Sequence, residues 1–178
     1  MDDIESQSRS NNLIISGGVL IGMSSDKISQ SFVQLFKQKV GVELPHENIL
    51  SSYRIGAKKL GQAPDSRKLL IKLRDGDTKR DILSAFRTKK PADFYANEDL
   101  IPLRAKLLYL LRRAKPRSNG KLVACGSSNG NVYAFIKPIN DAPRNQKIFV
   151  KNMDKLESLC EKEFEFPLSV LTGEISNQ

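Results

Sequence analysis

The residues best suited to do chemistry in this chain are cations and aromatic rings that recur together at helical spacing. Lys106, Tyr109 and Arg113 follow one another at intervals of three and four residues, so a helix would place them on one face. Arg112 flanks this face, and Arg117 follows just beyond it. Because cations neutralise phosphates and flat rings stack on bases, this pattern is typical of nucleic-acid binding.

Further cations and rings lie upstream. Arg80 and Arg87 fall on one face of a predicted helix, and Tyr53 and Arg54 end a predicted strand. For any one arginine, a solvated helix face is the alternative interpretation, and it is weaker for the whole cluster.

Two adjacent aromatic residues lie on another predicted strand. Strand alternation puts Phe94 and Tyr95 on opposite faces, so we expect at most one of them in the core. Half-buried packing remains the alternative for Tyr53 and Tyr95.

The charge of the chain is concentrated in its middle. The 178 residues include 29 Lys and Arg against 20 Asp and Glu, a net charge of +9. Residues 51–121 hold 19 basic and 7 acidic residues, which gives +12, while both flanking segments are slightly negative. Such a concentration favours a surface that binds a polyanion. The sequence has no run of about 18 apolar residues, so we expect no membrane partner.

The sequence offers little for catalysis. It contains no phosphate-binding G-x-x-x-x-G-K-[ST] loop and no G-x-S-x-G nucleophile turn. His46 lacks a positioned partner, and Cys125 is better explained as a small buried side chain. We therefore expect no catalytic residue, no metal, no cofactor and no enzymatic activity.

The elements that must position these groups follow from hydrophobic periodicity and turn residues. Over residues 11–97 the order is β-α-β-β-α-β, the ferredoxin-like arrangement that RRM domains share. The second strand, over residues 47–55, is expected to place Ile49, Ser51, Tyr53 and Ile55 on one face. Asp77 or Thr78 is expected to cap the second helix.

Residues 98–178 form a second predicted unit, a small α/β C-terminal domain. It is expected to contain a helix over 103–115, a hairpin of strands over 121–125 and 131–137, a short strand over 148–150 and a helix over 153–163. The fold class is therefore α+β, with residues 1–10 as a tail.

The RNA-binding template of typical RRM sheets does not fit. Those sheets carry aromatic residues on the first and third strands, whereas residues 13–16 and 67–74 contain none. We therefore expect binding at the sheet edge and in a basic cleft with the C-terminal segment.

Several motifs in order resemble the first open reading frame protein of LINE-type retrotransposons. They cover residues 4–17, 52–56, 67–72, 79–83 and 95–100. The last third, with its motifs at 119–122 and 147–151, is similar to the C-terminal region of the few-polyhedra proteins of insect viruses. The resemblance extends over nearly the whole chain.

The resemblance implies an atypical RRM followed by a small C-terminal domain, which together bind single-stranded RNA in the cleft between them without strong sequence preference. It also implies a nucleic-acid chaperone in a cytoplasmic ribonucleoprotein that also occurs in the nucleus. Relatives self-associate as trimers through an N-terminal coiled coil, and residues 1–10 resemble the end of that coil in a truncated chain. The family's basic positions match Arg54, Lys79, Arg80, Arg104, Arg112 and Arg113.

Two function classes remain at this point. The first is a sequence-tolerant RNA- or DNA-binding module, and the second is a viral or cellular structural protein that uses the same fold for protein contacts. The predicted nucleic-acid-binding residues are Tyr53, Arg54, Lys79, Arg80, Arg87, Tyr95, Arg104, Lys106, Tyr109, Arg112, Arg113 and Arg117.

Overall fold

The chain folds as two units, each with an antiparallel sheet and helices, so its class is α+β as predicted. The computed structural model describes residues 2–21, 23, 27–57, 65–138 and 144–173. The N-terminal unit is Ser8–Asp99, and the C-terminal unit is Leu100–Gln178, which also takes in Met1–Gln7. The helix α1, Asp2–Ser8, spans the junction between Gln7 and Ser8.

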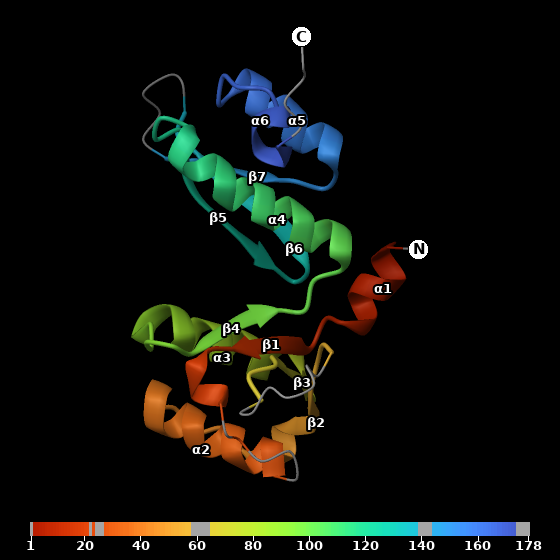
Figure 1. Cartoon of the computed structure of the whole chain (residues 1–178), viewed down its shortest axis with the longest axis vertical. Coiled ribbons are helices and arrows are strands. Elements are labelled where there is room, and N and C mark those ends of the chain that lie inside the picture. The colour runs from red at the N-terminus through yellow and green to blue at the C-terminus, as the bar shows by residue number, and fades with distance from the viewer. Residues whose placement is uncertain (1, 22, 24–26, 58–64, 139–143, 174–178) are drawn as a thin grey trace. The chain divides into compact units, whose positions relative to one another are not determined.

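The N-terminal unit has a four-stranded sheet in the order β2-β3-β1-β4, with every neighbouring pair antiparallel (Figure 1). Short 3₁₀ turns lie at Gly18–Leu20 and His46–Asn48. The strands and helices in chain order are β1 Asn12–Ser16, α2 Ile28–Val40, β2 Ile49–Arg54, β3 Leu69–Leu73, α3 Gly76–Lys89 and β4 Tyr95–Glu98.

The core of this unit lies between the sheet and its two helices. Phe32 and Phe36 of α2 contact Phe94 and Phe86, and the centroids of Phe86 and Phe94 are 4.8 Å apart. Phe94 is fully buried whereas the adjacent Tyr95 is 53% exposed, which confirms the prediction that only one of the two enters the core. Burial of each such ring contributes about 1.5–3 kcal/mol.

Two local predictions in this unit are wrong. Asp75, not Asp77 or Thr78, caps α3, because its side chain accepts a hydrogen bond from Thr78 N at 2.7 Å. A bulge between Ile49 and Ser51 shifts the register of β2 against β3. Ile49 therefore faces the core, while Ser51 and Tyr53 face the other side.

The C-terminal unit consists of a three-stranded antiparallel sheet in the order β5-β6-β7 with helices packed on one face. A 3₁₀ turn, Lys115–Arg117, follows the first of these helices. The elements are α4 Pro102–Ala114, β5 Leu122–Ser128, β6 Asn131–Ile136, β7 Gln146–Phe149, α5 Met153–Lys162 and α6 Ser169–Thr172.

A single apolar cluster holds the C-terminal unit together. Leu107 and Leu111 of α4, Ala134 of β6 and Leu156 of α5 are all fully buried in it. Among the helices that the structure describes, none has the length and apolar character needed to cross a bilayer.

Candidate nucleic-acid interface

Helix α4 separates its apolar and basic residues onto two faces. Leu107, Leu110, Leu111 and Ala114 are buried against the sheet, because apolar residues recur there with the period of a helix. The other side of α4, together with the 3₁₀ turn that follows it, carries what we call the α4 stripe: Lys106, Tyr109, Arg112, the half-buried Arg113 and Arg117.

The α4 stripe is ordered by contacts among its own members. The Arg113 guanidinium carbon lies 5.8 Å from the centroid of the Tyr109 ring, within the range of a cation–π contact. Arg117 donates from Nη1 to the carbonyl of Arg113 at 3.2 Å. Tyr109 is 58% exposed, so one large ring stands among these cations in contact with solvent.

No carboxylate that the structure describes neutralises the α4 stripe. Residues 102–117 contain no Asp or Glu, and within the described ranges no ion pair reaches a stripe cation. Exposed cations without acidic partners attract a polyanion and lose counterions when they meet phosphates. The stripe is therefore the strongest candidate for a phosphate-binding surface.

Arg104 belongs to the same helix but has another role. Its Nη1 donates to Asn131 Oδ1 at 2.8 Å and to the carbonyl of Gly130 at 3.5 Å. These bonds fasten the β5–β6 turn to the start of α4. The structure does not bring Arg104 together with the α4 stripe.

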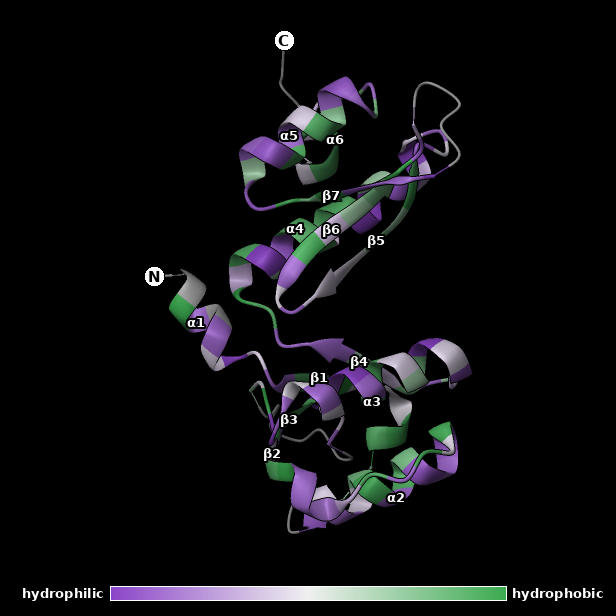
Figure 2. Ribbon diagram, turned by 180° about the vertical axis from the view of Figure 1, so that it is seen from behind, coloured by the Kyte–Doolittle hydropathy of each residue, from purple (hydrophilic) through white to green (hydrophobic). Residues whose placement is uncertain are grey.

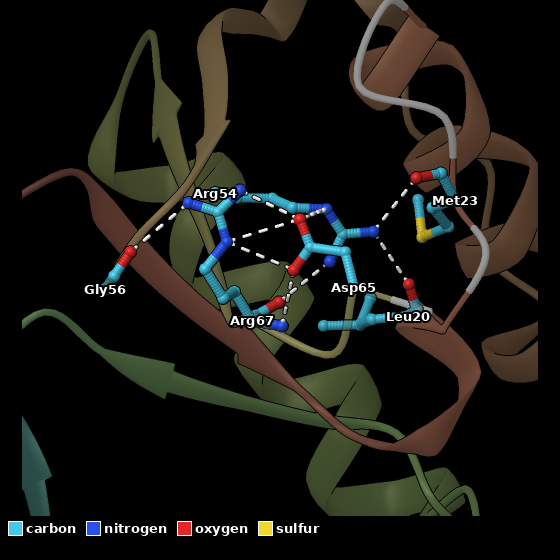
Figure 3. Close-up of polar contacts among 6 residues, drawn as sticks. All are labelled: Leu20, Met23, Arg54, Gly56, Asp65 and Arg67. Atoms are coloured by element: carbon cyan, nitrogen blue, oxygen red, sulfur yellow. Dashed lines mark hydrogen bonds and ion pairs between the residues drawn. The ribbon is translucent and has the colours of Figure 1, made fainter. Parts of the chain in front are cut away.

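Arg54 lies inside the N-terminal unit, contrary to its predicted place in the binding site. Its side chain is 2% exposed. Its Nη2 donates to the carbonyls of Leu20 at 2.8 Å and Met23 at 3.0 Å, and Nη1 donates to the carbonyl of Arg67 at 2.9 Å (Figure 3). Because these donors are occupied, Arg54 positions the segment after β1 and is not available to bind a phosphate.

Asp65 provides the negative charge of this network. It accepts from Arg67 Nη2 at 2.8 Å and lies 3.6 Å from Arg54 Nε (Figure 3). The hydrogen bonds from Arg67, reinforced by the Arg54 charge, hold the pKa of the Asp65 carboxyl well below its usual range.

Lys79 is also buried, contrary to the prediction that it contacts a phosphate. Its Nζ lies 2.8 Å from Glu98 Oε1, and the two side chains are 5% and 4% exposed. Nζ also donates to the carbonyl of Ser10 at 2.5 Å. Lys79 thus links α3 to β4 and to the chain before β1.

Arg80 and Arg87 remain accessible on α3. Arg80 pairs with Asp77 at 2.5 Å, but these side chains are 73% and 83% exposed, so the pair contributes little to stability. A phosphate could displace Asp77 from Arg80 at small cost. Both arginines lie in the helical layer.

Tyr53 and Tyr95 lie on the face of the sheet turned away from α2 and α3. Tyr53 pairs with Leu70, Leu70 with Ile14, and Tyr95 with Ser16 one row along. The two rings occupy the edge strands, about 15 Å apart across three strand spacings. The structure thus places these tyrosines and the α3 arginines on opposite sides of the sheet.

Sequence reasoning missed Lys72 on this same face. Lys72 pairs with Asn12 and Ser51 in the register that also sets Tyr53, and its side chain is exposed. The alternation within residues 67–74 carried the signal, because Lys72 follows Leu70 by two positions. This surface, which we call the open sheet face, has Tyr53, Lys72, Tyr95 and Asn97 among its exposed members.

Both cysteine thiols have raised pKa values. Burial raises the pKa of Cys125 and raises that of Cys160 to about 11, so neither is a thiolate at neutral pH. In the described part of the chain, no group of three or more His, Cys, Asp or Glu residues could hold a metal ion.

Comparison of the chain with models of protein families and with curated proteins finds no match. The candidate interface therefore depends on its residues and their geometry alone.

Proposed function

We propose that this chain binds single-stranded RNA or DNA without strong sequence preference, mainly by neutralising phosphates. The observation that carries the proposal is the α4 stripe, in which three exposed cations, the half-buried Arg113 and an exposed tyrosine have no acidic partner among the described residues. By binding in this way, the chain would act as a nucleic-acid chaperone in a retrotransposon ribonucleoprotein.

The architecture of the N-terminal unit supports the same proposal. The strand order β2-β3-β1-β4, with the apolar faces of α2 and α3 on one side, is consistent with a ferredoxin-like, RRM-like domain. The open sheet face supplies exposed tyrosines at its edges rather than at its centre, which fits an atypical member of that class.

Salt dependence tests the phosphate mechanism directly. Fluorescence anisotropy would follow binding of a labelled single-stranded RNA, the same sequence as DNA, and a duplex, each over a range of salt concentrations. If about four to six phosphates are engaged, log K against log salt should fall with a slope of about −3 to −4 for single strands. A binding constant that does not change with salt concentration would exclude the proposal.

Charge reversal locates the surface. Arg112→Glu with Arg113→Glu should weaken binding of many sequences alike and reduce the salt slope by about 1.4. The matched control is Lys155→Glu with Lys162→Glu, which makes the same charge change on exposed positions of α5. Equal losses in both variants would mean that net charge, rather than the α4 stripe, determines affinity.

A nuclease experiment separates this proposal from a structural protein that uses the fold for protein contacts. Partners captured by the intact chain should be lost after nuclease treatment if RNA bridges them. Partners that survive the treatment, together with a lack of binding to purified RNA, would favour the structural role.

A further inference from the structure

The C-terminal unit carries aromatic rings on the side of its sheet opposite the helices. Tyr133 and Phe135 alternate with the buried Val132, Ala134 and Ile136 along β6. Tyr133 pairs with Phe149 of β7, and Phe135 pairs with Lys147. Since paired residues point to the same face of a sheet, these four side chains share one surface, which we call the aromatic face.

The aromatic face is accessible rather than part of the core. Phe149 is 46% exposed, and Tyr133 and Phe135 are half-buried. Figure 2 shows the β5-β6-β7 sheet in front of α4, with this side turned toward the viewer. Three adjacent rings in contact with water form an exposed apolar patch, and such patches commonly mark binding sites.

Strand β5 leaves room beside the rings. Ala124, Gly126 and Ser128 are the β5 residues paired with Phe135, Tyr133 and Asn131. A Cβ atom at Gly126 would lie 2.7 Å from the Tyr133 hydroxyl oxygen and 3.0 Å from its Cζ. Because Gly126 is not among the residues with positive φ, its missing side chain serves the placement of the Tyr133 ring rather than a turn.

A cation lies directly over these rings. Lys147 Nζ is 4.5 Å from the Tyr133 centroid, 5.1 Å from that of Phe149 and 5.9 Å from that of Phe135. Residues 122–128, 131–136 and 146–149 contain no Asp or Glu, and no described carboxylate pairs with Lys147. The exposed Lys137 and Lys151 follow the ends of β6 and β7.

We propose that the aromatic face is a second binding site, at which unpaired bases of single-stranded nucleic acid stack on the rings while the exposed Lys147 side chain moves off them to contact the adjoining phosphate. The rings supply a flat apolar surface on which any base can stack. The lysines beside the rings, Lys137, Lys147 and Lys151, complement a polyanion, since the three strands contain no acidic residue. The inference rests on the proposed function, since it assumes that single strands are the ligand. It assigns base contacts to a side of the sheet that the α4 stripe does not occupy.

The test replaces the rings with aliphatic side chains, which keep the positions apolar but cannot stack on a base. The variant Tyr133→Leu with Phe149→Leu should bind a fluorescein-labelled single-stranded RNA about tenfold or more weakly than the natural chain. Its salt slope should stay unchanged, and its affinity for an abasic strand of equal length should also stay unchanged, because the phosphates are intact. The matched variant Tyr133→Phe with Phe149→Tyr keeps both rings and should retain full affinity.

A measurement on the unaltered chain guards against a folding defect in the variants. Ultraviolet cross-linking to a uridine-rich strand, followed by peptide mapping, should place cross-links on Tyr133, Phe135 or Phe149. Their absence there, or unchanged affinity in the Leu variant, would overturn the inference while leaving binding through the α4 stripe intact. An equal loss for the abasic strand would also overturn it.

Failure of the proposed function would be distinguishable. In that case the unaltered chain would bind neither normal nor abasic single strands, and both ideas would fall together. Concentration-dependent self-association that is abolished by the Leu variant, without any effect on RNA binding, would reassign the aromatic face to contact between copies of the chain.

Discussion

A buried charge pair in the N-terminal unit gives the clearest prediction for a single residue. Lys79→Met should destabilise the protein by about 3–5 kcal/mol, because the change leaves the Glu98 carboxylate buried without its cation. Urea unfolding would measure this loss. If Lys79 instead served as a phosphate contact, the variant would lose RNA affinity and keep its stability.

The pair can also be removed as a unit. Lys79→Met with Glu98→Leu should recover much of the lost stability, because no isolated charge remains in the interior. One Glu98 oxygen, Oε2, has no hydrogen-bond partner among the described residues, so replacing this side chain sacrifices little. A double variant no more stable than Lys79→Met would contradict this account.

Asp65 predicts how stability depends on pH. Its pKa in the folded chain lies below the ordinary value of 3.8, so its contribution is fully present above that value and is lost as the pH falls toward the folded pKa. Asp65→Asn should therefore lower the urea midpoint at neutral pH. The difference in urea midpoint between the natural protein and the Asp65→Asn variant should narrow once the pH drops below 3.8. A difference in urea midpoint that does not depend on pH would show that Asp65 stabilises the protein through the packing of its side chain rather than through its charge.

The same residues show where sequence reasoning fails for single side chains. Arg54 follows Tyr53, and alternation alone permits either of them to face the core. The bulge near Leu50 determines the answer, because after it Tyr53 points outward and Arg54 inward. Bulges have no reliable signal in one sequence, so the buried arginine and its carbonyl partners could not be predicted.

Helix α3 allows a prediction about how an element begins. Asp75→Ala should cost about 1 kcal/mol, because the side chain that accepts from Thr78 N is lost. Asp77→Ala should change stability far less, since its ion pair with Arg80 is almost fully exposed. Thermal unfolding of the two variants provides the comparison. Equal losses would indicate that the acidic charge near the helix start matters more than the cap.

Elements with strong periodicity were the most predictable. The helix expected over 103–115 is observed as Pro102–Ala114, and its basic face follows directly from the spacing of its leucines. The aromatic face was missed for a different reason. In the sequence, nothing distinguishes Tyr133, Phe135 and Phe149 from ordinary strand residues. Only the pairing of β6 with β7 shows that their side chains lie on one surface beneath Lys147.

For the whole molecule, the net charge of residues 51–121 overstates the surface available to a ligand. Arg54 and Lys79 are committed to the interior, and Arg67 is held by Asp65. The accessible cations belong to both units and include those of the α4 stripe, Arg80 and Arg87 on α3, and Lys72 on the open sheet face. Under the proposed function, a single strand bound to one unit would have a raised effective concentration at the other, because Asp99 joins Leu100 directly.

Strand length should reveal whether both units engage one molecule of nucleic acid. A strand of about five nucleotides can occupy little more than one surface, whereas one of about twenty can reach several. A longer strand offers more positions at which the protein can bind, which raises its apparent affinity. After this statistical gain is subtracted, the longer strand should still bind roughly a hundredfold more tightly than the shorter one. Tyr53→Ala with Lys72→Glu should weaken only the longer strand, and Arg112→Glu with Arg113→Glu should weaken both. Competition anisotropy with unlabelled strands measures each case, and equal losses for both lengths in the Tyr53 and Lys72 variant would exclude two-unit binding.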